Sequence, residues 1–283
     1  MAGVITASEP SWTAPFSGLS PHQFGKLVTA LRREGADPDR KGRPWSLPLE
    51  DRMLLVTAHW RTNLTLRQLA LLFGVSKSAA DRIADHLGPS LVLQPRKRFR
   101  RDAVLIVDGT PVPTRNHTVA EQSKNYRYST NHQVIIDADT RLVVVVGRPL
   151  PGNRNDCKAW ELSRAKDAVG RTTVVADGGY RGTGLVIPHR RERGQAELAA
   201  WKEEHNASHR KGRARVEHAF ARMKTWKILR DCRLKGDGVH HAMLGIARMH
   251  SLALAGYRAN GQAIRHVRDH LRDKPYDLMH GWR

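Results

Sequence analysis

Residues 103–108 read AVLIVD, and residues 172–177 read TTVVAD. Each stretch is an apolar or β-branched run that ends in an aspartate, and a glycine follows both times, as Gly109 and as Gly178. Short apolar runs bounded by glycine are typical of buried strands. We therefore predict two strands of one sheet, each closed by a carboxylate at the strand end.

The sequence between and after these runs completes a mixed α/β pattern. Apolar runs alternate with amphipathic stretches, which predicts a mixed sheet flanked by helices. The remaining elements are predicted, in chain order, as a hairpin around residues 139–140, a helix opened by Asn155 or Asp156, a short strand over 185–188, a basic helical stretch over 195–230 and an apolar helix over 239–256.

The first part of the chain has a purely helical pattern. The stretch LPLEDRMLLVTAHWR, from Leu47, predicts one helix. Thr65 precedes LRQLALLFG and Ser76 precedes KSAADRIADHLG, and a hydroxyl side chain in that position caps a helix. Two capped helices joined by a short Gly-Val turn predict a helix-turn-helix at about residues 47–90.

A basic segment, PRKRFRR at residues 95–101, lies where the helical pattern gives way to the alternating one. The predicted division is a helical DNA-binding domain over residues 1–94, a basic linker over 95–102, a catalytic domain over 103–260 and a tail over 261–283.

Charge narrows the class of partner. The 283 residues carry a formal net charge of +21. Residues 1–90 contribute +3 of it (11 basic, 8 acidic) and residues 91–283 contribute +18 (37 basic, 19 acidic). A surplus this uneven favours a polyanion, so nucleic acid is the first candidate and an anionic membrane the second. No apolar stretch approaches the ~18 residues that span a bilayer, which excludes the membrane reading.

Cysteine usage and the N-terminus indicate the compartment. The two cysteines, Cys157 and Cys232, form no Cys-x-x-Cys pair, which argues against a disulfide framework and a thiolate zinc site. No basic segment followed by an apolar run marks a signal peptide. We expect a cytoplasmic protein associated with the nucleoid.

Three carboxylates stand out as candidates for catalysis. Two-metal phosphoryl transfer needs several carboxylates that converge on one point from rigid elements, because hard cations such as Mg²⁺ prefer oxygen ligands. Asp108 and Asp177 end the two buried runs, and Glu217 lies in the basic helical stretch, four residues after Arg213 and seven before Lys224. Those spacings place the three side chains on one helix face.

Each carboxylate alone has a plainer interpretation. A single aspartate after a strand is more often a turn or capping residue. Glu217 alone would be an ordinary acid on a solvated basic face. Asp156, at a helix start, is more often an N-cap, so it is a secondary candidate for the site.

At these residues the chain resembles the DDE-type transposases of bacterial insertion sequences. VDGTPVP resembles the family's first-aspartate motif and ADGGYRG its second. Arg213, Glu217 and Lys224 resemble the Arg, three residues, Glu, six residues, Lys signature, although the family's usual Tyr three residues before that Arg is Arg210 here. The helix-turn-helix resembles the one that precedes these catalytic domains, and the likeness covers about residues 19–257.

The resemblance implies a function and a fold. It implies a transposase that cuts DNA at element ends and transfers the strand into target DNA, with Asp108, Asp177 and Glu217 as catalytic and metal-binding residues. It implies Mg²⁺ or Mn²⁺, two ions in number, and a homodimer on double-stranded DNA. The predicted element order independently matches a ribonuclease H-like sheet. The residues expected to contact DNA are Lys77, Arg82, Arg96, Lys97, Arg98, Arg213 and Lys224.

Two other functions fit the same residues. One is a plain metal-dependent nuclease on the same fold, which a strand-transfer assay would distinguish. The other is a DNA-binding regulator with a decayed catalytic domain, which the presence of all three carboxylates argues against.

Overall fold

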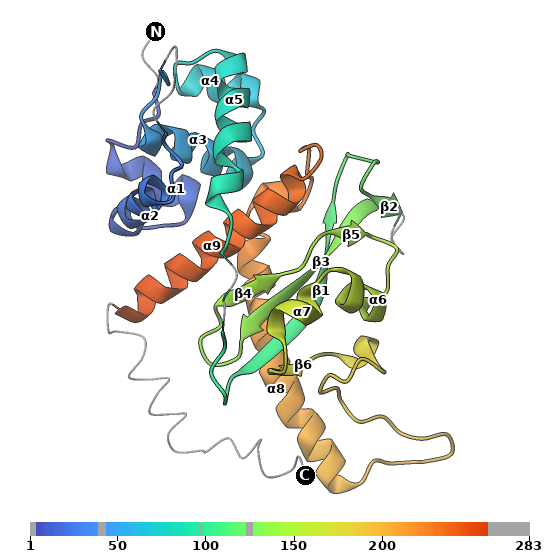
Figure 1. The fold of residues 1–283 in the computed structure, drawn as a ribbon. Helices are drawn as coiled ribbons and strands as arrows, with labels where there is room; N and C mark the ends of the chain where they lie inside the picture. Colours follow the sequence, from blue (N-terminus) through green and yellow to red (C-terminus); the bar gives the residue numbers. More distant parts are fainter. Residues whose placement is uncertain (1–3, 39–43, 95, 97, 123–126, 260–283) are drawn as a thin grey trace.

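The protein's structure is a computed structural model, and it describes residues 4–38, 44–94, 96, 98–122 and 127–259. A group of short helices forms its N-terminal part, and a sheet with helices on both faces follows (Figure 1). The N-terminal helices are η1 (Pro10–Trp12), α1 (Thr13–Ser17), α2 (Pro21–Arg33), α3 (Leu49–Thr62), α4 (Leu66–Leu72), α5 (Lys77–Leu87) and η2 (Pro89–Leu91).

The predicted caps of the helix-turn-helix are confirmed. The Thr65 hydroxyl accepts a hydrogen bond from the backbone N–H of Gln68, and the Ser76 hydroxyl accepts one from that of Ala79. Gly74, in the turn between them, has a φ of +66°, a conformation that glycine adopts without steric cost. Local hydrogen bonding therefore fixes where α4 and α5 begin.

The sheet is mixed. Its strands are β1 (Val104–Pro113), β2 (Glu121–Gln122), β3 (Tyr128–Asp137), β4 (Val143–Val146), β5 (Leu150–Pro151) and β6 (Thr173–Val175). Strand β3 pairs antiparallel with β1, β2, β4 and β5, whereas β6 runs parallel to β1. An antiparallel meander followed by a parallel strand on the far side of β1 is the predicted ribonuclease H-like arrangement.

Helices cover both faces of this sheet. They are α6 (Asp156–Leu162), α7 (Ala165–Val169), α8 (Ala200–Met223) and α9 (Gly238–Ala259), and the short helices η3 (Gly178–Tyr180) and η4 (Lys227–Leu229) lie in the connections. On β1, Leu105 and Val107 pack in the core under α6 and α7, and Ile106 packs with α8 and α9 on the other face. Because alternate residues of a strand face opposite sides, Asp108 projects toward α8.

Strand β1 does not end at Asp108 as predicted but continues to Pro113. The N–H of Thr114 donates to the Tyr128 carbonyl of β3. Because successive N–H groups of a strand point to opposite edges, the even-numbered residues of β1 direct their N–H groups at β3. Pro111 and Pro113 face the other edge, where β6 pairs no further than Ile106. A proline there costs no ladder hydrogen bond, so the strand tolerates both.

The N-terminal helices and α9 are in close contact. Gln23 of α2 donates a side-chain hydrogen bond to the Leu252 carbonyl, at 3.0 Å. A Cβ atom at Gly245 would lie 2.3 Å from the Trp60 ring, so only glycine lets α3 and α9 approach this closely. One hydrophobic cluster runs from these helices through α8 and α9 to the sheet. The division at residues 95–102 therefore stays a prediction. Within the described part of the chain, none of the helices combines the length and apolar character that crossing a bilayer requires.

Candidate active site

Asp108 and Arg213 form the centre of the candidate site. The guanidinium of Arg213, on α8, donates from Nη2 to Asp108 Oδ2 at 3.0 Å and lies 3.9 Å from Asp177 Oδ2. Asp108 Oδ1 accepts a hydrogen bond from the N–H of Gly109. The predicted aspartates are thus brought together around one cation.

Asp177 lies just beyond β6, where it caps the short helix η3. Its Oδ1 accepts a hydrogen bond of 2.7 Å from the N–H of Gly179. The capping role that a lone aspartate suggests is therefore real, but Oδ1 serves it while Oδ2 faces Arg213. Strand β6 itself ends at Val175, two residues before the predicted end.

Asp156 belongs to the same cluster, and it is not the N-cap of α6. The Asn155 side chain caps that helix by accepting from the N–H of Lys158, so Asp156 occupies the first helical position. A Cβ atom at Gly109 would lie 2.7 Å from Asp156 Oδ1, and one at Gly179 would lie 3.0 Å from Oδ2. Glycine at both positions leaves the room in which this carboxylate sits.

The pKa of Asp108 is shifted by burial and by the nearby charged groups. The pKa of Asp108 is raised to about 6, chiefly by burial; the charge of Arg213 opposes this shift, and the charges of Asp177 and Asp156 add to it. Desolvation disfavours the charged form of an acid, and like charges do the same. Without a bound cation, ionising these carboxylates is therefore unfavourable. A bound cation would offset that repulsion, as is expected of a cation-binding site.

Glu217 and Lys224 lie on the same side of α8 as Arg213. Lys224, whose pKa burial lowers, also experiences the charge of Asp108, which acts to raise it. Arg213 contacts that carboxylate directly. Glu217 is exposed and lies between the two in the sequence, on the same face of the helix.

A buried hydrogen bond that the sequence did not single out supports the cluster from the α6 side of the sheet. The Tyr180 hydroxyl donates to Gln133 Oε1 at 2.6 Å. Burial, followed by the charges of Asp156, Asp108 and Asp177, raises the pKa of Tyr180 well above its usual range, so the hydroxyl keeps its proton. The YRG part of the second motif contained this residue, but only the fold shows that Gln133 on β3 faces it.

The donor set suits a hard divalent cation, although the side chains are not arranged as a finished metal site. Among the residues that the structure describes, no three His, Cys, Asp or Glu side chains converge tightly enough to hold an ion. The guanidinium of Arg213 instead lies between Asp108 and Asp177, where a cation is expected. Carboxylate oxygens are among the ligands that Mg²⁺ and Mn²⁺ prefer. We conclude that the residues fit such an ion once Arg213 moves aside.

The predicted DNA-contacting residues on the N-terminal side lie on the surface. On α5, Lys77 pairs with Asp81, and Arg82 is exposed. Arg96 and Arg98 are exposed in the segment before the sheet. Lys97 lies outside the described residues.

Two protein-family models and one relative match most of this chain. The model of the Transposase DDE domain matches residues 100–252, and that of the helix-turn-helix of DDE superfamily endonuclease matches residues 45–96. The transposase assigned to insertion sequence element IS112 of Streptomyces albus G is 84% identical over 256 residues, which cover 90% of this chain and all of that relative.

Two more distant proteins are also similar. The transposase assigned to insertion sequence element IS702 of Microchaete diplosiphon is 24% identical over 232 residues, 75% of this chain and 83% of the relative. A cryo-EM structure of the piggyBac transposase synaptic complex with hairpin DNA superposes with a TM-score of 0.46 and 10% identity, over 93% of this chain and 78% of that one. The match to the Transposase DDE domain covers more than half of the chain, and the IS112 relative matches 90% of it, so the chain belongs to the DDE transposase family.

Proposed function

We propose that this transposase cuts DNA at the ends of its element and joins the freed ends to target DNA in one active site. The observation that supports this most directly is the cluster of Asp108, Asp177 and Asp156, the first two of them facing Arg213, within a DDE transposase domain. DDE domains act on DNA with divalent metal ions, and a cluster of this composition is where such ions are expected.

The proposed metal ligands are Asp108, Asp177 and Glu217, for two ions of Mg²⁺ or Mn²⁺. When bound, these ions supply Lewis-acid stabilisation of the charge that develops on the attacked phosphate. Asp156 lies close enough to share in holding the second ion or to tune the charge of the first.

Two bond exchanges follow from this chemistry. In the first, the oxygen of water bonds to a phosphorus at the element end, the P–O3′ bond breaks, and the departing 3′-oxygen takes a proton. In the second, the freed 3′-hydroxyl loses its proton and bonds to a phosphorus of target DNA, whose own P–O3′ bond breaks. Each step makes one P–O bond and breaks one, and the proton that the attacking oxygen loses offsets the proton that the departing 3′-oxygen gains, so atoms and charge balance.

The chain's own residues position the DNA for both steps. Arg213 and Lys224, which both face Asp108, supply positive charge for the phosphate beside the reacting one. The Tyr180 to Gln133 hydrogen bond holds β3 against η3 and so keeps Asp177 in register with β1. These contacts pre-organise the carboxylates before DNA arrives.

Recognition of the element end is assigned to the helix-turn-helix. The second helix of such a motif lies in the major groove with its first residues at the base edges. Here that helix is α5, and it presents Lys77 and Arg82. The further parts of this proposal are that residues 1–94 and 103–260 act as two domains and that the protein works as a homodimer on double-stranded terminal repeats.

The deciding experiment mixes the full-length protein with a duplex that carries its own flanking DNA, a supercoiled plasmid target and Mg²⁺. Cuts at the element end together with duplex joined to plasmid are the expected products. Cuts without joined product would show a plain nuclease and would overturn the strand-transfer step. Absence of both products in Mg²⁺ and in Mn²⁺ would overturn the catalytic proposal as a whole.

A further inference from the structure

Arg190, which the sequence did not single out, lies against the loop that carries Asp177. A Cβ atom at Gly178, the residue after Asp177, would lie 2.7 Å from Nη2 of Arg190 and 3.4 Å from its Cζ. The guanidinium therefore packs on the bare backbone of Gly178, and its Nη2 donates to the Gly178 carbonyl at 3.3 Å. A side chain at position 178 would displace it.

Two elements hold the segment from which Arg190 extends. Val186 makes two backbone hydrogen bonds of 2.9 Å with β6 and the residue that follows it. The side-chain amide of Asn206, on α8, accepts from the His189 N–H at 2.8 Å and donates to the His189 carbonyl at 3.0 Å. Because the backbone is fixed directly before Arg190, this side chain starts from a defined position and loses less entropy when it binds a ligand.

Helix α8 thereby places two arginines at the loop that carries Asp177. Asn206 and Arg213 are seven residues apart, so they lie on the same face of α8. Arg213 reaches Asp177 directly, at 3.9 Å, whereas Asn206 holds the backbone that precedes Arg190. The two guanidinium groups therefore come from separate segments, and one helix positions both.

Arg190 forms no ion pair with a carboxylate of the described residues. The oxygens of Asp177 are already engaged, Oδ1 by the Gly179 N–H and Oδ2 by Arg213. A guanidinium has five N–H donors, and Arg190 uses one of them in its contact with Gly178. Since the side chain is exposed, the other donors are available to a bound anion.

We infer that Arg190 binds a phosphate of the DNA strand that is cut, next to the carboxylates. This rests on the proposed function, which brings that strand to Asp177. A planar guanidinium can bond two phosphate oxygens at once, and this one lies on the loop of a proposed metal ligand. Target DNA enters the site only after the first cut, so a residue that holds the cut strand should act before target DNA is present.

The test replaces phosphates around the element end, one at a time, by neutral methylphosphonates. It measures binding of each end duplex by the full-length protein, with Ca²⁺ in place of Mg²⁺ and without target DNA. The variants are Arg190→Gln, which loses the charge, and Arg190→Lys, which keeps it. The matched control is Arg193→Gln, which removes another exposed arginine of the same segment.

We expect one methylphosphonate to weaken binding by the unchanged protein about tenfold, and binding by Arg190→Gln less than about twofold, because that variant has already lost the contact. Arg190→Lys and Arg193→Gln should stay sensitive to the same phosphate.

A purely structural role of Arg190 would instead lower every affinity of Arg190→Gln by the same factor, and that result would overturn the inference. An equal loss of sensitivity in Arg193→Gln would also overturn it, since it would show diffuse charge. Because binding is measured without cleavage, an error in the proposed cutting and joining leaves these results unchanged.

Discussion

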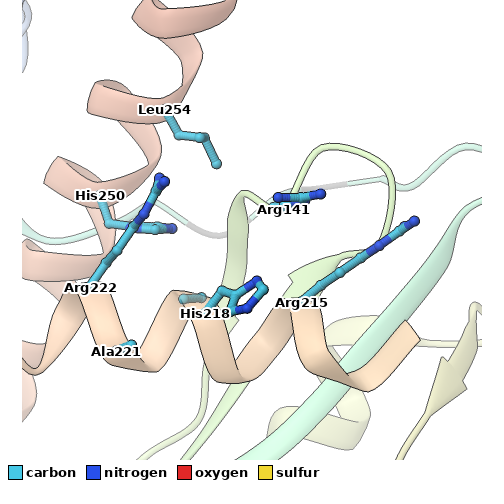
Figure 2. Close-up of a pocket in the computed structure, with 8 residues that line it drawn as sticks. Arg141, Arg215, His218, Ala221, Arg222, His250 and Leu254 are labelled. Atoms are coloured by element: carbon cyan, nitrogen blue, oxygen red, sulfur yellow. The ribbon is translucent and has the colours of Figure 1, made fainter. Parts of the chain in front are cut away.

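The two sides of helix α8 differ in how their charge is balanced. On the front, Arg213 is paired with Asp108 and faces Asp177, so positive and negative groups share one small site. On the rear, Arg222 lies half a turn around the helix from Arg213 and, with His250 of α9, lines two adjoining hollows that we call the rear groove (Figure 2). A site that combines carboxylates with a guanidinium can exchange that cation for a metal ion, whereas the described lining of the rear groove offers a metal ion no carboxylate ligand. The front of α8 therefore suits a metal ion, and the rear does not.

The largest effect is expected on the front. Asp108→Asn and Asp177→Asn should each lower Mg²⁺-dependent cutting and joining by roughly a thousandfold or more, because each removes a charge that holds an ion. Binding to end DNA, followed by gel shift, should remain. The double variant should be about as inactive as either single one, since a metal site acts as a unit.

Asp167→Asn is the matched control, because it removes an exposed carboxylate from α7, on the other side of the sheet. Cleavage by that variant should stay near the unchanged rate. If Asp108→Asn retained a tenth of the activity, the front of α8 would not be the catalytic face.

Glu217 and Asp156 are the two candidates for the third metal-binding carboxylate. Glu217→Gln should abolish cutting to about the extent of the aspartate variants, whereas Asp156→Asn should cost roughly tenfold through altered charge. The measurement is the single-turnover rate on a short end duplex. The reverse order of the two effects would move the third ligand from α8 to α6.

End recognition gives an intermediate effect and separates base reading from backbone binding. Arg82→Ala on α5 should weaken binding to end DNA by about 1–3 kcal/mol and reduce the preference over scrambled DNA. Competition gel shifts with the two duplexes measure this, and an equal loss on both with Arg82→Ala would remove α5 as the reading helix.

The smallest effect concerns stability without metal. The folded pKa of Asp108, about 6, lies above the ordinary value of 3.8, so ionising this group costs stability as pH rises through that interval. Asp108→Asn removes a cost of at most about 3 kcal/mol, less what the partial exposure screens.

In EDTA at pH 8 this variant should therefore melt a few degrees above the unchanged protein, and below pH 4 the difference should vanish. Thermal melts at both pH values check the prediction. A lower melting temperature at pH 8 would show that the pairing with Arg213 outweighs desolvation.

The features that were predictable from the sequence are those set by nearby residues. Thr65 and Ser76 act as caps through hydrogen bonds three residues away, so the pattern alone locates α4 and α5. The strand that carries Asp108 was predicted, but its end was not. Pro111 and Pro113 follow Asp108 closely, and only the pairing of β1 shows that their missing N–H groups face the edge on which β6 pairs no further than Ile106.

The sequence predicted which aspartates belong to the candidate site better than it predicted how they are arranged. Asp108 and Asp177 follow from their apolar runs, but the place of Asp156 depends on which neighbour caps α6, and a sequence offers both Asn155 and Asp156. The Tyr180 to Gln133 bond joins residues 47 positions apart. The roles of Glu217, Lys77 and Arg82 remain predictions for the experiments above.

The contact between Gly245 and Trp60 sets a distance. Because α3 rests on α9 with no room for a side chain between them, the helix-turn-helix and the carboxylate cluster cannot slide or swing past each other without breaking that packing. An end whose bases are read by α5 would then meet Asp108 at a fixed number of base pairs from the recognised sequence. In this arrangement the protein itself sets the distance between the recognised sequence and the cut. Gly245→Ala should loosen that distance, so that cuts would fall at several neighbouring phosphates instead of at one.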